Sequence, residues 1–210
     1  PAGPPPPPDG GAAALRPPAP LPVGPLAVRS RAAAPDPRAT RPLQVRALIH
    51  VVLSRGEEAL ADAESAVRLA GPADPGALNH RAYIRALVGR DLDAALADIE
   101  AALGDAADAE PALLDTRGYV LHLLGRHAEA IDDLNRAIAV SASRRGELAA
   151  LVRHGDRVAA ARELRSLDRE LAVMHRHRGL ACRAAGLDAQ AEQDLTIAAQ
   201  KGYDPSRGVM

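Results

Sequence analysis

The chain of 210 residues contains no phenylalanine and no tryptophan, and it has only three tyrosines and one cysteine. A single cysteine excludes an internal disulfide and a metal site built on several thiolates. Without Phe and Trp, the core has to consist of Leu, Ile, Val and Ala, which suits closely packed helices. No run approaches the ~20 apolar residues of a membrane-spanning helix, so we expect no membrane partner. We also see no signal-peptide pattern and expect a cytoplasmic protein.

The charges nearly cancel, at a formal net charge of −1, but they are unevenly distributed. Residues 91–133 carry 11 acids against two arginines, and residues 141–183 carry ten arginines against five acids. Such runs are usually solvated helix faces. Two alternatives remain open. The Arg-rich 141–183 segment could bind nucleic acid, although without a global positive charge we do not expect nucleic acid as the main partner. The acidic part could instead dock on the basic part of a second copy, which would be self-association.

Prolines are concentrated at the start of the chain, where residues 1–42 hold 14 of the 18. Proline lacks a backbone N–H and fixes its own φ, so such a segment forms neither helix nor sheet. We predict that residues 1–42 are a disordered Pro/Ala-rich tail or linker. It would act as a tether or, alternatively, dock on an aromatic-lined groove. The folded domain is predicted over residues 43–208.

One pattern recurs four times in that domain: an alanine, an aspartate three residues later, a small or aliphatic residue next to it, and an alanine three residues further on. The copies are Ala59–Ala66, Ala95–Ala102, Ala130–Ala137 and Ala191–Ala198. An arginine followed by Ala or Gly lies 13 or 14 residues before each copy. These arginines, spaced by 35, 36 and 61 residues, are Arg46, Arg81, Arg117 and Arg178. A fixed period of this length indicates one helical unit that is copied and stacked.

Apolar residues at helical spacing predict an antiparallel hairpin of two helices in each unit. We expect helices near 43–54, 56–70, 75–88 and 92–103, and a helix opened by Pro111. Asp74 is expected to cap one of them, and Gly89, Gly125 and Gly186 to mark turns. The small residue after each repeated arginine should face the partner helix and let the two axes approach closely. A larger residue at Gly118 would then overpack the contact.

The 61-residue spacing exceeds one period by about 27 residues, and the excess lies near residues 141–171. We predict that the second helix of the third unit runs on to about Arg153 and that a long helix from about Arg157 leads into the fourth unit. Together they would form an elongated hairpin. A degenerate extra repeat is the alternative, and Gly146 could equally break the first of these helices.

The repeated residues resemble the tetratricopeptide repeat (TPR) family. The resemblance covers roughly residues 40–110, 111–142 and 168–208, and the best unit runs from Leu114 through Gly118 and Gly125 to Ala137. Two features depart from the family pattern. The second unit has one extra residue in its turn, and the usual large aromatic residue is replaced by Leu43, Leu78, Leu114 and His175. The resemblance implies an all-α, right-handed α-solenoid of about four TPR-like hairpins, with the elongated hairpin before the last repeat.

In the TPR family, ligand peptides lie in a concave groove lined by the first helix of each unit. Residues two before, two after and five after each repeated arginine share one face of that helix. Carried over to this chain, the candidate groove residues are Gln44, Leu48, Asn79, Tyr83, Asp115, Tyr119, His122, Arg176, Leu180 and Arg183. We expect Tyr83 and Tyr119 either to anchor a partner or to pack between units. The Lys- and Asn-based clamp by which some family members hold a terminal carboxylate is not reproduced.

The remaining polar residues are interpreted as structural. Each repeated arginine should form an ion pair with an aspartate of the repeat, within or between units, and so fix hairpin register. His175 and His177 are two residues apart and cannot clamp a metal as an i,i+4 pair does, so we take the histidines as ordinary surface or half-buried residues. No nucleophile motif, phosphate loop or carboxylate pair is present. We therefore expect no catalytic residue, cofactor or metal, and a non-enzymatic scaffold that binds a protein or peptide.

Overall fold

The structure of the chain is a computed structural model that describes residues 37–104, 110–154 and 157–203. All of the described residues belong to one compact unit, Ala34–Met210. Every element within the described ranges is an α-helix, as the repeat pattern predicts. Residues 1–36 of the predicted tail lie outside the described residues.

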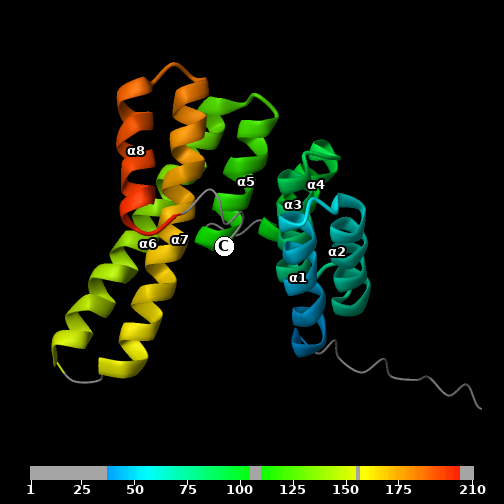
Figure 1. Cartoon of the computed structure of the whole chain (residues 1–210), viewed down its shortest axis with the longest axis horizontal. Helices are drawn as coiled ribbons and strands as arrows, with labels where there is room; N and C mark the ends of the chain where they lie inside the picture. Colours follow the sequence, from blue (N-terminus) through cyan, green and yellow to red (C-terminus); the bar gives the residue numbers. More distant parts are fainter. Residues whose placement is uncertain (1–36, 105–109, 155–156, 204–210) are drawn as a thin grey trace, which may run out of the picture. The chain divides into compact units, whose positions relative to one another are not determined.

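The described part of the chain contains eight helices (Figure 1). In chain order they are α1 (Pro37–Val52), α2 (Gly56–Ala70), α3 (Pro75–Val88), α4 (Leu92–Leu103), α5 (Pro111–Leu123), α6 (His127–His154), α7 (Arg157–Ala184) and α8 (Asp188–Gln200). The predicted helices at 56–70, 75–88 and 92–103 are confirmed with the same bounds, and Pro111 does open α5. None of the described helices has the length and apolar character needed to cross a bilayer.

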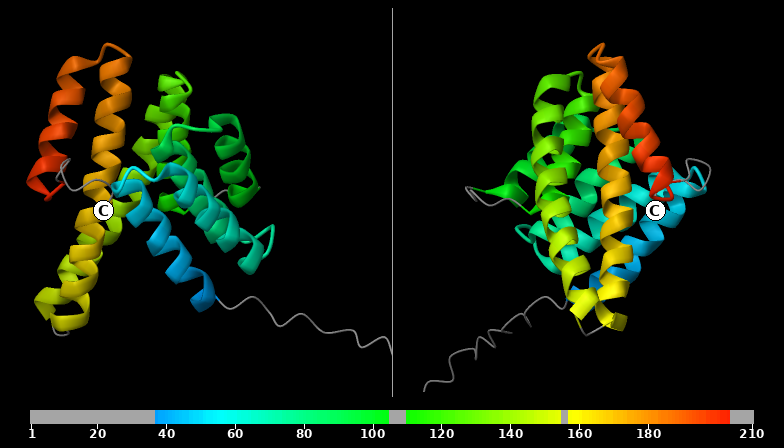
Figure 2. Two further views of the ribbon diagram at one scale, coloured as in Figure 1. Left: turned by 45° about the vertical axis from the view of Figure 1, so that its right-hand side comes forward. Right: turned by 90° about the vertical axis from the view of Figure 1, so that its left-hand side faces the viewer.

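Each odd-numbered helix packs against the even-numbered helix that follows it, so the chain forms successive antiparallel hairpins (Figures 1 and 2). Successive odd-numbered helices also contact one another: α1 contacts α3, α3 contacts α5, and α5 contacts α7. In addition, α6 lies along α7. The first helices of the hairpins thus lie next to each other, and side chains far apart in sequence can meet there.

Local chemistry explains where the helices begin and end. The Asp74 side chain accepts a hydrogen bond from the Ala77 N–H at 2.7 Å, and Pro75 occupies the first turn of α3, where its missing N–H has no helical partner to lose. Gly89 ends α3 in the left-handed conformation, at φ +70°, which a residue with a Cβ seldom adopts. The predicted cap and turn are both confirmed.

The start of α1 differs from the prediction. The helix begins at Pro37, six residues before the expected start at 43, and it passes through Pro42. Proline in the body of a helix removes one i→i−4 hydrogen bond. Because Pro42 is exposed, water can hydrate the carbonyl group that loses its partner. The boundary of the helical domain therefore lies earlier in the chain than composition alone indicated.

The insertion before the last hairpin forms two long helices that pack on each other. Both α6 and α7 contain 28 residues, which corresponds to about 42 Å of helix. The helix α6 ends at His154, close to the predicted Arg153, and α7 begins at the predicted Arg157. The elongated hairpin is therefore confirmed. The helix runs unbroken through Gly146, and no extra pair of helices is inserted within the described ranges.

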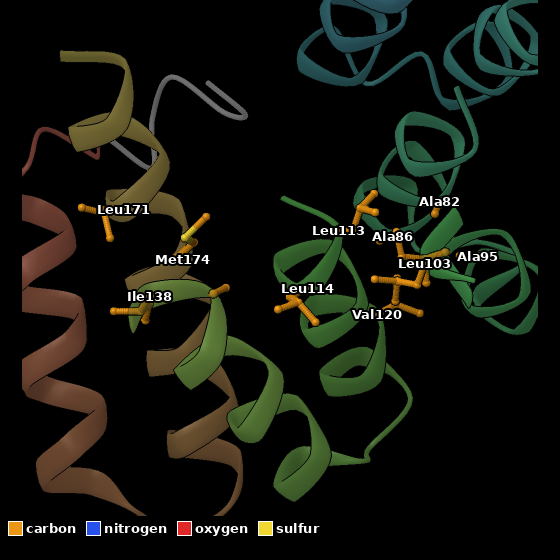
Figure 3. Close-up of a cluster of buried hydrophobic side chains, with 12 residues drawn as sticks. Ala82, Ala86, Ala95, Leu103, Leu113, Leu114, Val120, Ile138, Leu171 and Met174 are labelled. Carbon is orange, nitrogen blue, oxygen red and sulfur yellow. The ribbon is translucent and has the colours of Figure 1, made fainter. Parts of the chain in front are cut away.

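The buried core consists mainly of Leu, Ile, Val, Met and Ala side chains. Figure 3 shows its largest cluster, to which α3, α4, α5, α6 and α7 all contribute. Ile99 and Val120 are fully buried in it, and Leu114 and Met174 are nearly so. A smaller cluster around Ile84 joins α1, α2 and α3. Each hairpin is thus held to the next by apolar contacts.

The small residue after each repeated arginine faces the partner helix, as predicted. Ala47 and Ala82 are completely buried. A Cβ added at Gly118 would lie 2.7 Å from Leu134 Cγ and 3.1 Å from the Ala130 carbonyl oxygen. These separations are shorter than normal van der Waals contact, so α5 and α6 approach as closely as they do because residue 118 has no side chain.

Candidate functional site

The four repeated arginines and aspartates pair within each hairpin. Arg46 binds Asp62, Arg81 binds Asp98, Arg117 binds Asp133 and Arg178 binds Asp194, each through Nε and one terminal nitrogen at 2.6–2.8 Å. The predicted ion pairs are confirmed, and they lie within units. All four aspartates are buried. Two-pronged binding to a buried carboxylate fixes how far one helix slides along the other.

The surroundings of each pair set the charge state of its carboxyl group. Hydrogen bonding from Arg46 lowers the pKa of Asp62. Burial alone would raise the pKa of Asp194, but hydrogen bonds from Arg178 and His175 bring it below its ordinary value. Both carboxyl groups are therefore ionised at neutral pH and serve as structural anchors.

The prediction for His175 and His177 is wrong, because both side chains are buried and each binds a carboxylate. His175 Nδ1 lies 2.8 Å from Asp194 Oδ1. His177 Nδ1 lies 2.9 Å from Asp115 Oδ1, a contact that joins α7 to α5. Two residues apart, they reach different neighbours because α7 is enclosed by α5 on one side and α8 on another. The spacing of the two histidines in the sequence does not reveal which helices surround α7.

The aromatic side chains gather between α3, α5 and α7. The Tyr119 ring stacks on the His177 ring with centroids 4.1 Å apart, and the Tyr83 ring lies 6.4 Å from the Tyr119 ring. Tyr119 also packs against the main core cluster. Both tyrosines are half-buried. Burial raises the pKa of each phenol, so both hydroxyl groups stay protonated.

A cavity of about 650 Å³ opens between α1, α3, α5 and α7. Four of the ten predicted groove residues line it, namely Gln44, Asn79, Tyr83 and Asp115. The other lining residues are Gly76, His80, Ala112, Thr116, Ser166, Arg169, Glu170, Val173 and Met174. The volume is in the range of known small-ligand sites and is large enough for one or two side chains of a peptide.

Two polar atoms at this cavity have no partner among the described residues. Asn79 Oδ1 and His80 Nε2 are both buried and make no hydrogen bond there. Burial lowers the pKa of His80 to about 4, so the imidazole is neutral at physiological pH. Buried polar atoms are normally satisfied, so two such atoms on residues that line a cavity mark a place where a small side-chain movement would let a ligand supply the missing hydrogen bonds.

The other six predicted residues lie away from this cavity. Leu48 packs against the cluster of α1, α2 and α3, and Tyr119 belongs to the aromatic group. His122 Nδ1 lies 3.2 Å from His127 Nδ1, across the turn between α5 and α6. The Arg176 guanidinium lies 4.8 Å from the centre of the Tyr203 ring. Leu180 is half-buried and Arg183 is exposed. The predicted face of α7 therefore does not line the cavity with the others.

The part of α7 that does line the cavity was missed. Ser166, Arg169, Glu170 and Val173 lie five to twelve residues before Arg178. A register counted from the repeated arginine does not reach them. Their spacing of three, one and three residues places them on one face of the helix, and that signal could have found them. His80 was missed because its neighbour Asn79 fitted the repeat register and His80 did not.

The Arg-rich hairpin uses several of its charges internally. Arg144 binds Glu163 at 2.6 Å, and Arg145 binds Asp168 at 2.7 Å. Lys201, just after α8, also reaches Asp168. Together with Arg178, which binds Asp194, at least three of the ten arginines in residues 141–183 are neutralised by ion pairs, which reduces the charge this segment can offer to a polyanion.

The described residues contain no group of three or more His, Cys, Asp or Glu side chains arranged to hold a metal ion. Cys182 is fully buried, and burial raises the pKa of its thiol, so it is a core residue as predicted. In comparisons with known proteins, no family model, no curated protein and no solved structure matches the chain. Its function is therefore inferred from its own residues.

Proposed function

We propose that the chain is a non-enzymatic scaffold that binds a segment of a protein or peptide in the cavity between α1, α3, α5 and α7. We further propose that its hairpins form a right-handed, TPR-like solenoid of about four units. The observation that carries the proposal is the cavity itself, which is lined by the first helices of all four hairpins and includes Asn79 and His80, each with a buried side-chain atom that makes no hydrogen bond to the described residues.

Several features support this assignment. The Arg–Asp pairs and small interface residues recur in every hairpin, as stacked repeats require. The first helices contact one another in succession, so their exposed faces can act together on one ligand. The polar and apolar groups that line the cavity suit recognition of a partner's side chains. Binding is thus the better supported role.

The test is a selection from a random peptide library on the full chain, followed by affinity measurements on a variant with a blocked cavity. Ala112→Trp places a large ring at the exposed, cavity-lining start of α5. Ala142→Trp is the matched control, because Ala142 is an exposed helical alanine of α6 that does not line the cavity. We expect peptides selected on the wild type to bind the control equally and to lose at least tenfold in affinity on Ala112→Trp. Selected peptides that bind Ala112→Trp as well as the wild type would contradict the proposal.

A second candidate, self-association, is favoured by one surface. Val45, Ile49, Val52 and Leu53 form an apolar stripe along α1 and the turn after it, and each is at least 50% exposed. The stripe follows i, i+4, i+7 and i+8 spacing, which is typical of a helix face that meets another helix. A second copy of the same stripe, related by a two-fold axis, is the partner that such a face suits.

Self-association is measured by sedimentation velocity over a range of protein concentrations. We expect dimers that the Ile49→Glu variant abolishes. Leu151→Glu is the control, because Leu151 is also an exposed aliphatic residue but lies on α6. A wild type that stays monomeric at every concentration, or an equal effect of both variants, would exclude pairing through α1.

A further inference from the structure

Asp115 differs from the other buried aspartates. Five aspartates are buried in the described part of the chain, and each of the other four binds at least one guanidinium group. Asp115, at 8% exposure, has His177 as its only hydrogen-bond partner among the described residues, and that bond uses Oδ1 alone. Burying a carboxylate is costly unless a charge and several hydrogen bonds compensate for it. Asp115 therefore lacks the guanidinium partner that each of the other four has.

Asp115 lines the cavity, and the groups around it also favour a positive charge. Asn79 Oδ1 is an unpaired acceptor among the described residues, and the neutral His80 adds no positive charge. The Tyr83 ring offers a π face, which attracts guanidinium and ammonium groups. The cavity thus combines a carboxylate, an amide oxygen and an aromatic ring.

The charged side chains at the rim do not reverse this preference. Glu170, on α7, adds a second carboxylate, which accepts a hydrogen bond from Ser166. Arg169 is the one cationic side chain among the residues that line the cavity, and it is exposed. It makes no ion pair with Asp115 within 4.0 Å. The residues that line the cavity thus include two carboxylates and one cation, while a second cation, Arg176, acts on the Tyr83 hydroxyl from outside the lining.

We propose that the cavity binds a cationic side chain of the partner, an arginine or a lysine, whose charged group pairs with the Asp115 carboxylate. This inference rests on the proposed function and adds the chemistry of the ligand. Arginine fits the site better than lysine does, since a planar guanidinium can donate to Asp115 and Asn79 at the same time and stack on Tyr83. On binding, the partner's arginine would form with Asp115 the same kind of Arg–Asp pair that the chain forms internally in each of its hairpins.

The experiment uses the cavity-dependent peptides from the library selection. Each is resynthesised with its arginine replaced by citrulline, which keeps the shape and removes the charge, and with lysine as a second replacement. Affinity is measured for the wild type and for the Asp115→Asn, Glu170→Gln and Glu192→Gln variants. Glu192 is the matched control, because it is an exposed acid of α8 outside the cavity. In Asp115→Asn the amide oxygen can still accept a hydrogen bond from His177, so the contact between α5 and α7 has a substitute.

We expect citrulline to weaken binding at least tenfold, lysine to weaken it less, Asp115→Asn to weaken it tenfold or more, and Glu170→Gln two- to threefold, with no effect of Glu192→Gln. Equal binding of the arginine and citrulline peptides, or cavity-dependent peptides that carry no cation, would overturn the inference and leave the proposed function standing. If no selected peptide depends on the cavity, both fail. The citrulline comparison uses the wild-type chain, so it decides the question even if Asp115→Asn does not fold.

Discussion

The close approach of α5 and α6 at Gly118 can be tested by adding a single methyl group. In Gly118→Ala, the new Cβ would lie 2.7 Å from Leu134 Cγ and 3.1 Å from the Ala130 carbonyl oxygen. Overpacking of this kind costs about 1–3 kcal/mol, while replacing glycine by alanine inside a helix returns about 1 kcal/mol. We expect Gly118→Ala to lower the free energy of unfolding by up to about 2 kcal/mol, taken as the difference between these two effects.

Gly146 provides the matched control within α6. It is also helical and exposed, and a Cβ added there meets no atom within 4 Å. Gly146→Ala should therefore raise stability by up to about 1 kcal/mol. A Cβ added at Gly179 would have its nearest atoms 3.0–3.2 Å away, so the change in stability of Gly179→Ala should lie between those of Gly118→Ala and Gly146→Ala. The order of the three variants does not depend on the absolute cost of any one contact.

Urea unfolding followed by far-UV circular dichroism measures these differences. In a Leu134→Ala background the 2.7 Å contact is removed. Gly118→Ala should then cost at least about 1 kcal/mol less than it does in the wild type, the size of a coupling between touching residues. A Gly118→Ala protein as stable as Gly146→Ala would show that the two helices are not held at this separation, and the account of the small-residue interface would be refuted.

Two further predictions concern buried charge. Arg117→Ala leaves the buried Asp133 carboxylate without its partner and should lower the free energy of unfolding by about 3 kcal/mol or more. Arg117→Met combined with Asp133→Leu should lower it by less than Arg117→Ala alone does. Urea unfolding measures both variants, and equal losses would contradict the pairing. Because the pKa of His80 is about 4 in the folded chain and about 6.5 when unfolded, the unfolded state takes up the proton first, and stability falls as the pH drops from 6.5 toward 4. Between about pH 7 and pH 5 this loss amounts to about 2 kcal/mol, worked from the two pKa values by linkage. His80→Gln should remove it, and an unchanged pH profile in that variant would show that His80 is not buried as a neutral group.

Most helix boundaries could be predicted from the sequence, because glycine and proline act locally. Gly89 and Pro111 set the backbone at their own positions, so the end of α3 and the start of α5 do not depend on distant contacts. Pro42 shows the limit of this reasoning, since a proline read as a helix breaker lies inside α1. One missing hydrogen bond on an exposed face was outweighed by the packing of α1 on α2 and α3.

The candidate site was less predictable, because it depends on which helices meet. The repeat register correctly brought Asn79, Tyr83 and Asp115 to one cavity, since equivalent positions of stacked helices lie next to each other. It failed for α7, whose inserted turns displace the cavity-lining residues from the register set by Arg178. The burial of His175 and His177 also depends on neighbours more than fifteen residues away in sequence. No local pattern contains that information.

Because each Arg–Asp pair is closed within its own hairpin, the alignment of the two helices is encoded entirely inside one unit of the chain. A hairpin duplicated by recombination would carry its own alignment with it and would need only new apolar contacts to its neighbours. Lengthening α6 and α7 leaves the pair Arg178–Asp194 intact for the same reason. The chain can thus gain or extend units without a compensating change elsewhere, which makes variation in the number of hairpins among related proteins the expected outcome of its evolution.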